Sequence, residues 1–305
     1  MRITLLANRD LHSNFALNLL LPRLAKEHSL TLFLSDTVGG NRPQQPDLQW
    51  LHFLEQTLCN DILFPNLDRV GAKGELLTFS ALETALERPW ASLNNPNSEA
   101  GLAALAGTNP DLMICLRYGC ILQPAAIGIP PRGVLNLHSG RLPHYRGVMA
   151  TFRAMLARDS LLSTTLHWIE DASIDTGRVV SIHSESLDLQ RCYLNNVLTL
   201  YETGCAAVIE AVHTLSTNQD LKSSPTKGAG DYFSFPTESD CEAFRSAGCR
   251  WVDATFLATI LRRYYPPHET SVQLGLPPIE LSEAELLTLY RATQHPQTAR
   301  EPRRP

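Results

Sequence analysis

Residues 133–158 read GVLNLHSGRLPHYRGVMATFRAMLAR, and this stretch decides the fold class. The segment at 133–137 is predicted to be a strand, and the polar loop at 138–147 follows it directly. The segment at 150–158 is typical of a helix. Because open α/β sheets place ligands at the carboxyl ends of their strands, we expect this loop to carry the chemistry.

The same alternation of strands and helices runs through the chain from its first residues. Further strands are predicted at 2–7, 30–34, 112–116, 163–169 and 178–184, and helices at 15–28, 48–58, 99–106 and 193–215. Parallel neighbouring strands need a long crossover, which a helix supplies. The order therefore predicts an α/β fold with a mostly parallel sheet flanked by helices. No G-x-G-x-x-G follows the first strand, so the fingerprint of a dinucleotide site is missing.

Composition shifts divide the chain into a main domain and a smaller region. Residues 1–215 form the predicted main domain, and 216–230, rich in Ser, Thr, Asn, Lys and Gly, read as a linker. Residues 231–294 are expected to form a small, mainly helical C-terminal region, with helical patterns at 239–247, 253–264 and 282–293. The Pro- and Arg-rich tail at 295–305 has almost nothing to bury and is predicted to be disordered.

Charge and cysteine usage exclude several classes of protein. The 305 residues carry 26 Lys and Arg against 31 Asp and Glu, a formal net charge of −5, so no basic field is available to hold nucleic acid. Seven scattered cysteines without a C-x-x-C pair indicate reduced thiols rather than disulfides or a zinc site. The first apolar run stops at Asn8, too early for a signal peptide or a membrane span. We expect a cytoplasmic protein without nucleic-acid, membrane or metal partners.

Two polar constellations carry the candidate chemistry. Alternation along a strand puts Asn136 and His138 on one face of the sheet, and an amide donor beside an imidazole suits acyl-type transfer, in which an oxyanion forms and a proton moves. Downstream, Asp175 lies in an Asp-Thr-Gly turn between two predicted strands. There it is able to raise the basicity of His138 and hold its tautomer. His144 and His167 are interpreted as a loop residue and a sheet residue.

These segments resemble the formyltransferase family, which includes methionyl-tRNA formyltransferase, glycinamide ribonucleotide transformylase and sugar-nucleotide N-formyltransferases. The family signature is N-x-H-x-S-L-L-P-x-Y-R-G followed by an acid in a D-x-G turn. The residues in register are Asn136, His138, Leu142, Pro143, Tyr145, Arg146, Gly147, Asp175 and Gly177. Residues 111–122 also resemble the family's D-L-x-V-x-x-x-Y-G-x-I-L segment. The resemblance covers about residues 1–215 and implies a Rossmann-like sheet.

The resemblance implies 10-formyltetrahydrofolate as formyl donor and a primary amine as acceptor. Asn136 would bind the oxygen that gains charge, His138 would polarise the formyl group and shuttle protons, and Asp175 would orient His138 and accept the amine proton. The donor-binding residues carried over from the family are Leu122, Gly140, Arg141, Leu142, Pro143, Asp171, Ala172, Ser173 and Ile174.

Departures from the family pattern leave the acceptor open. Gly140 and Arg141 replace the usual Ser and Leu, so Arg141 reads either as a contact to an anionic acceptor or folate tail, or as a solvated side chain. An amino-sugar nucleotide, a hydroxyornithine-like amine and a ribonucleotide amine all fit, whereas tRNA is disfavoured by the acidic chain and its helical C-terminal region. A 10-formyltetrahydrofolate deformylase and a non-catalytic folate-binding module are the alternatives. The C-terminal region is expected to shape the acceptor pocket or a homodimer interface.

Overall fold

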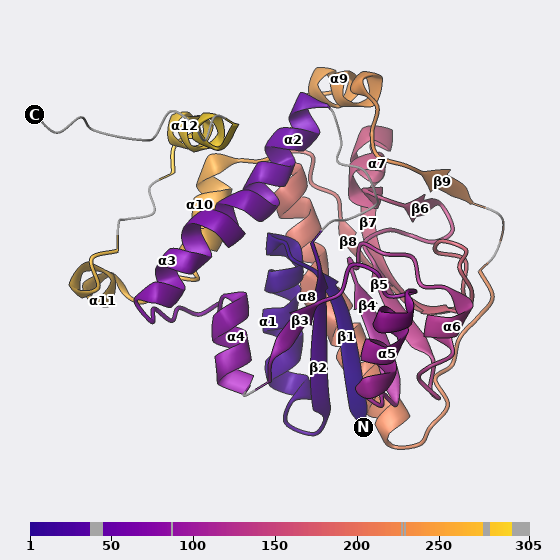
Figure 1. Cartoon of the computed structure of the whole chain (residues 1–305). Helices are drawn as coiled ribbons and strands as arrows, with labels where there is room; N and C mark the ends of the chain where they lie inside the picture. The colour runs from indigo at the N-terminus through magenta and orange to yellow at the C-terminus, as the bar shows by residue number, and fades with distance from the viewer. Residues whose placement is uncertain (37–44, 87, 227, 229, 277–280, 295–305) are drawn as a thin grey trace, which may run out of the picture.

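The computed structural model describes residues 1–36, 45–86, 88–226, 228, 230–276 and 281–294 (Figure 1). The tail for which we predict disorder lies outside these residues. Among the described residues, no helix combines the length and apolar character needed to cross a membrane.

A seven-stranded sheet forms the centre of the molecule, in the order β3-β2-β1-β4-β5-β7-β8. Its strands are β1 (Arg2–Asn8), β2 (Ser29–Ser35), β3 (Trp90–Ser92), β4 (Leu112–Leu116), β5 (Val134–His138), β7 (Leu161–Ile169) and β8 (Val179–Ser186). The first five in this order pair in parallel, whereas β7 is antiparallel to both β5 and β8. The prediction of a mostly parallel, Rossmann-like sheet is therefore confirmed.

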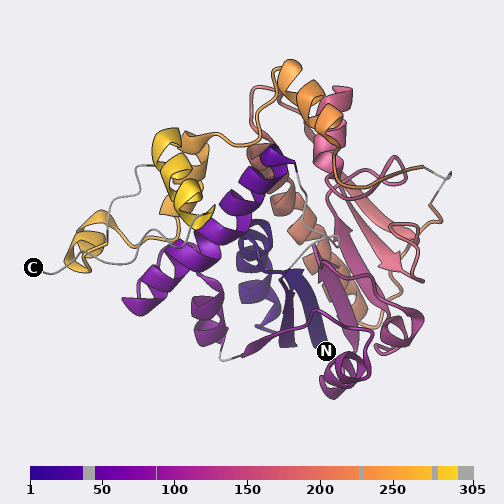
Figure 2. The ribbon, with the colours of Figure 1, turned by 45° about the horizontal axis from the view of Figure 1, so that its top comes forward.

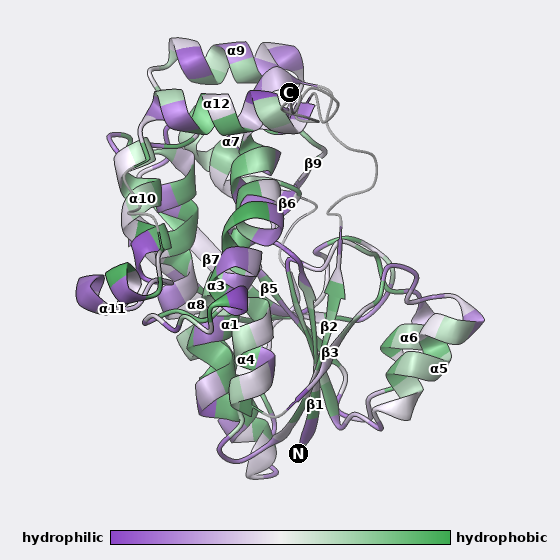
Figure 3. Ribbon diagram, turned by 60° about the vertical axis from the view of Figure 1, so that its left-hand side comes forward, coloured by the Kyte–Doolittle hydropathy of each residue, from purple (hydrophilic) through white to green (hydrophobic). Residues whose placement is uncertain are grey.

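Helices cover both faces of this sheet (Figure 3). One face carries α1 (Leu11–Leu24), α4 (Phe79–Leu86) and α8 (Tyr193–Ser216), and the other carries α5 (Glu99–Gly107) and α6 (Pro124–Ile127). The larger buried cluster lies on the α1 and α8 side, and a smaller one, around Leu6, Leu105 and Met113, lies under α5 and α6. Strands with helices on both faces need apolar residues throughout, which explains the continuous apolar run of β4.

The helix predicted at 48–58 is part of a longer, continuous helical segment. It begins with α2 (Pro46–His52), continues as a π-helical segment η1 (Phe53–Leu63) and ends with α3 (Phe64–Arg69). Sequence periodicity does not reveal the π-helical segment, because its wider turn depends on tertiary contacts. π-Helical turns inside α-helices occur frequently at functional sites.

The C-terminal region packs against the main domain along several of its elements (Figure 2). It consists of β9 (Asp231–Phe233), α9 (Glu238–Ser246), α10 (Ala254–Arg262), α11 (His268–Gln273) and α12 (Glu283–Gln294). Trp251 stacks on Phe152 of α7 (Ala150–Ala157), with ring centroids 5.1 Å apart and planes 5° apart. The Tyr264 hydroxyl donates to Asn14 Oδ1 of α1 at 2.6 Å. Residues from both parts therefore share one buried cluster.

Within the predicted linker, Ser224 pairs with the sheet. Its backbone N–H and C=O form two hydrogen bonds of 2.8 Å with Val179 at the start of β8. A short strand pair then joins β9 to β6 (Tyr145–Gly147), in parallel register and separate from the large sheet. Sequence reading missed β6 and β9, and also the equally short β3, because three residues carry no recognisable alternation.

Candidate active site

Strand pairing brings the polar residues of two distant segments to one place. Asn136 of β5 lies directly opposite His167 of β7, and His138 lies opposite Thr165. Asp175 follows β7 in the turn before β8, with φ +54, and its side chain reaches back to the end of β5. The left-handed backbone at Asp175 is one that Asp tolerates better than most residues. Asn136, His138 and Asp175, which the sequence singles out, therefore lie together.

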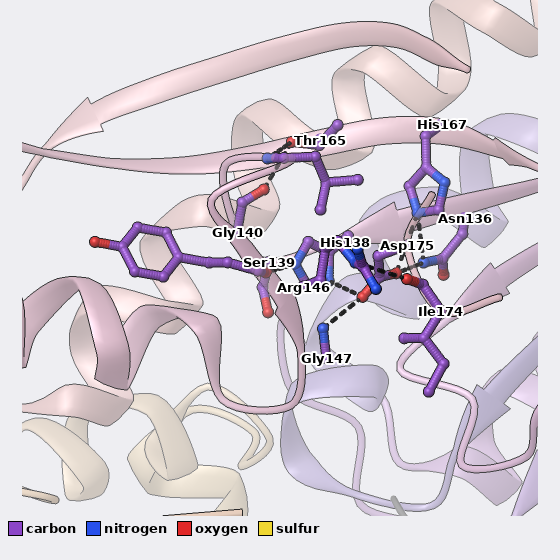
Figure 4. Close-up of polar contacts among 12 residues, drawn as sticks. Asn136, His138, Ser139, Gly140, Arg146, Gly147, Thr165, His167, Ile174 and Asp175 are labelled. Carbon is purple, nitrogen blue, oxygen red and sulfur yellow. Dashed lines mark hydrogen bonds and ion pairs between the residues drawn. The ribbon is translucent and has the colours of Figure 1, made fainter. Parts of the chain in front are cut away.

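The Asp175 carboxylate is the centre of this cluster (Figure 4). Its Oδ2 atom lies 3.5 Å from His138 Nδ1 and accepts from the Gly147 backbone N–H at 2.8 Å. Its Oδ1 atom lies 3.3 Å from His167 Nε2 and 3.4 Å from Asn136 Nδ2. With only 9% of its surface exposed, Asp175 meets protein groups on both oxygens.

The surroundings of Asp175 lower its pKa to about 2. Burial acts in the opposite direction, but the charge of His138, the hydrogen bond of His167 and the Gly147 N–H together outweigh it. Asp175 is therefore ionised throughout the neutral range. A carboxylate with so low a pKa is a strong ion-pair partner and a weak base.

This low pKa links Asp175 to folding stability. A carboxyl group whose pKa falls from 3.8 to about 2 on folding contributes on the order of 2 kcal/mol above pH 4. The contribution is lost as pH falls through the folded pKa. We expect Asp175→Asn to be less stable than the parent at pH 6 and to approach it near pH 2.5, in urea unfolding followed by tryptophan fluorescence. An equal difference at both pH values would contradict the low pKa.

Both ring nitrogens of His138 face hydrogen-bond acceptors. Nε2 lies 2.6 Å from the backbone oxygen of Tyr145, and Nδ1 faces Asp175. These two acceptors can receive the two N–H groups of a doubly protonated imidazole. Gly140 packs closely on the ring, since a Cβ there would lie 2.6 Å from Nε2 and 2.5 Å from Ala150 Cβ. The tight contact with His138 and Ala150 therefore explains why glycine, and not the usual Ser of the family pattern, occupies position 140.

His167 belongs to the same cluster, although sequence reasoning gives it only a place in the sheet. It is 1% exposed, and its Nδ1 lies 2.9 Å from the backbone oxygen of Trp168. Because that oxygen only accepts, Nδ1 carries a proton, and Nε2 lies between Asn136 Nδ2 at 3.0 Å and Asp175 Oδ1 at 3.3 Å. The available signal was an ionisable residue inside a predicted strand whose other polar residues, Ser163, Thr164 and Thr165, are uncharged. Its contact with Asn136 depends on which strand lies beside β7.

The residues expected to bind the donor occupy different environments. Leu122, Gly140 and Leu142 are buried, Arg141, Asp171 and Ser173 are exposed, and Pro143, Ala172 and Ile174 are half-buried. Thr165 holds the first turn, donating to the Gly140 oxygen at 2.7 Å and accepting from the Leu142 N–H at 3.2 Å. Arg146 Nε donates to the Ile174 oxygen at 3.2 Å and thereby joins the two turns. Their contacts to a donor remain a prediction.

A metal centre has no candidate in the part of the chain that the structure describes. There, no three or more His, Cys, Asp and Glu side chains gather closely enough to hold an ion.

Comparison with known proteins finds a similarity over the segment that contains this cluster. Residues 63–187 match the family model described as "Formyl transferase". Over this segment the chain is similar to the formyl transferase family. The matched segment contains Asn136, His138, His167 and Asp175, whereas the C-terminal region lies outside it. The family resemblance of the sequence motifs is thereby confirmed.

Curated formyltransferases resemble parts of the chain. A methionyl-tRNA formyltransferase of Nitrosococcus oceani is 43% identical over 90 residues, which are 30% of this chain and 27% of that protein. Its counterpart in Hydrogenovibrio crunogenus is 32% identical over 158 residues, covering 50% of this chain and 49% of that protein. The chain thus spans between about a quarter and a half of these two relatives.

Solved formyltransferase structures share the fold. A 4-N formyltransferase from Francisella tularensis superposes with a TM-score of 0.52 at 11% identity, covering 81% of this chain and 87% of that one. A sugar N-formyltransferase from a Shewanella species gives a TM-score of 0.50 at 14% identity, with the same coverage of 81% and 87%. At such low identity these similarities concern the fold alone.

Proposed function

We propose that this protein is an N-formyltransferase that moves a formyl group from 10-formyltetrahydrofolate to a primary amine of a small molecule. The observation that carries the proposal is the convergence of Asn136, His138 and Asp175 within the segment that matches the family. An amide, an imidazole and a carboxylate in contact are the groups that acyl transfer to nitrogen requires.

The proposed reaction needs charge stabilisation and a balanced movement of protons. The amine nitrogen attacks the formyl carbon, the bond from that carbon to N10 of the folate breaks, the amine loses a proton and N10 gains one. The Asn136 amide stabilises the formyl oxygen as it becomes negative, and His138 polarises the same group and carries the proton. The low pKa of Asp175 suits it to hold a charged His138 better than to take the amine proton itself.

The donor is proposed to lie across the two turns that Arg146 joins. Leu122 and residues 140–143 would line one side of the donor, and residues 171–174 the other. The turn residues Asp171 and Ser173 are exposed, so their side chains are available to a ligand. A hollow lined by 94–98, Cys120 and Ile121 opens beside Leu122 at the same edge of the sheet.

Among acceptors, a small molecule is favoured over tRNA. The net charge of −5 provides no overall basic field for a phosphate backbone, and the C-terminal region is mainly helical in the residues that the structure describes. An amino-sugar nucleotide, a hydroxyornithine-like amine and a ribonucleotide amine are the proposed classes. The curated relatives carry the name methionyl-tRNA formyltransferase, so methionyl-tRNA is the second candidate.

The deciding experiment follows the absorbance change as 10-formyltetrahydrofolate becomes tetrahydrofolate. It is run without acceptor, with each proposed amine and with methionyl-tRNA. Turnover that depends on one amine supports the proposal and identifies the acceptor, whereas equal turnover without any amine would establish a deformylase instead. Donor binding without turnover across the whole panel would favour a non-catalytic folate-binding module.

Substitutions of the two β5 residues test the proposed chemistry. Asn136→Ala and His138→Ala are each expected to lower turnover by about a hundredfold or more, because each removes a group that acts on the formyl oxygen. Circular dichroism checks that both variants fold. A nearly normal rate in either folded variant would exclude the role assigned to that residue.

A further inference from the structure

The short strand β6 touches both charged members of the candidate site through its backbone. Its Tyr145 oxygen lies 2.6 Å from His138 Nε2, and its Gly147 N–H donates to Asp175 Oδ2 at 2.8 Å. These two groups are two residues apart, so they face the same side of an extended strand. One edge of β6 therefore contacts both His138 and Asp175 through its backbone.

The other edge of β6 is covered by the C-terminal region. Tyr145 is in register with Asp231 and Gly147 with Phe233, and the Val148 N–H donates to the Phe233 oxygen at 3.0 Å. The strands meet so closely that a Cβ on Gly147 would lie within 2.1 Å of the Phe233 oxygen. β9 is the strand that pairs with β6 in the described parts of the chain.

Side chains fix β9 in this position. The Phe233 ring packs near the Tyr145 ring, with centroids 6.0 Å apart, and Arg153 of α7 lies 5.0 Å above it. Arg153 also forms an ion pair of 3.0 Å with Asp240 of α9. At the start of β9, Gly230 has φ +60 and packs against the backbone of Pro143, so that a Cβ there would lie 1.8 Å from the Pro143 oxygen.

We propose that β9 is a positioning element of the active site, which presses β6 against His138 and Asp175 so that the Tyr145 oxygen and the Gly147 N–H hold the catalytic pair. The inference rests on the proposed function and assigns a role to a region outside the segment that matches the family. An isolated strand of three residues has too few hydrogen bonds to keep its place. A partner strand anchored by Phe233 and Gly230 supplies the missing restraint.

The test compares two glycine substitutions in the C-terminal region. Gly230→Ala puts a methyl group into the backbone of Pro143 and displaces β9, whereas Gly248→Ala has a similar positive φ, +76, and meets nothing within 4 Å. Both variants place alanine at a positive φ, and only Gly230→Ala also displaces β9. We expect Gly230→Ala to lower kcat by about tenfold to a hundredfold with a smaller change in the KM of the donor, and Gly248→Ala to retain the parental kcat.

A spectroscopic readout separates this inference from the proposed function. Carbon-13 NMR titration of the Asp175 carboxyl needs no turnover, and weakening the Gly147 N–H bond should raise the pKa of Asp175 in Gly230→Ala while Gly248→Ala leaves it unchanged. Should the protein transfer no formyl group at all, the titration still reports on β9. An unchanged titration together with a parental kcat in Gly230→Ala would overturn the inference.

A second pair of variants covers the case in which Gly230→Ala fails to fold. Phe233→Ala removes the ring that rests on Tyr145 and under Arg153, whereas Phe233→Tyr keeps it. We expect Phe233→Ala to show the loss of kcat and the raised pKa of Asp175, and Phe233→Tyr to recover both. A loss of thermal stability in Phe233→Ala with parental kcat and pKa would assign β9 a structural role only and contradict the proposal.

Discussion

Asp175→Asn is expected to lower kcat by about a hundredfold to ten-thousandfold in the formyl-transfer assay. The substitution keeps the size of the side chain and removes its charge. The Gly147 N–H retains an oxygen to bond, but His138 loses the anion that faces Nδ1 at 3.5 Å, and His167 Nε2 no longer faces a carboxylate at 3.3 Å. The charged form of His138 is then no longer stabilised, so both its orientation and its proton transfer suffer.

Asp188→Asn is the matched control for this substitution. Asp188 also lies in a turn and accepts a backbone N–H, from Gln190 at 2.9 Å, but its side chain is 44% exposed. The kcat of Asp188→Asn should stay within about twofold of the parental value, since surface substitutions away from special features have small effects. The role of Asp175 would be refuted by a folded Asp175→Asn variant that turns over as fast as Asp188→Asn.

Local patterns were sufficient for most of the main domain. The apolar runs of β4 and β5 and the polar loop after β5 follow from hydrophobic periodicity, because their environment repeats along the chain. Alternation likewise predicted that Asn136 and His138 share a face. The pairing of β7 beside β5, which brings His167 to Asn136, needed the sheet order, and periodicity does not contain that information.

Contacts between distant segments account for what the sequence did not predict. β6 and β9 are strands only because each provides the other's hydrogen bonds, and neither has a pattern of its own. The π-helical segment is similar, since it turns Glu55 inward toward charged residues from other elements. Both features lie at or near the carboxyl edge of the sheet, where tertiary contacts override the local preference of the sequence for a secondary structure.

A buried charged cluster near the same edge of the sheet also depends on contacts between distant segments. Arg117 follows β4, the neighbour of β5, and its Nη2 lies 2.9 Å from Asp10 Oδ2 and 3.6 Å from Glu55 Oε2. Asp10 caps α1 by accepting from the Ser13 N–H at 2.7 Å, and His12 Nε2 lies 3.3 Å from Glu55 Oε1. Burial raises the pKa of Glu55 to about 8 and lowers that of His12 to about 3. Near neutral pH the cluster is therefore an ionised pair, Asp10 and Arg117, beside two largely neutral groups.

Arg117→Met should lower the free energy of unfolding by about 3–5 kcal/mol, because it leaves the Asp10 carboxylate, 1% exposed, without its cation. Urea unfolding followed by circular dichroism measures the loss. The double variant Asp10→Asn with Arg117→Met should recover part of it, since no uncompensated charge then remains buried.

Two single variants serve as controls for the stability loss expected in Arg117→Met. Arg263→Met breaks an ion pair with Glu75, whose side chain is 67% exposed, and should cost at most about 1 kcal/mol. Glu55→Gln should also cost much less than Arg117→Met near pH 7, because Glu55 is largely protonated there and the amide resembles the neutral acid. If Arg117→Met proves no more costly than Arg263→Met, Asp10 must be solvated or neutral in the folded protein. In that case the turn between β1 and α1 would be open to water rather than sealed by the pair.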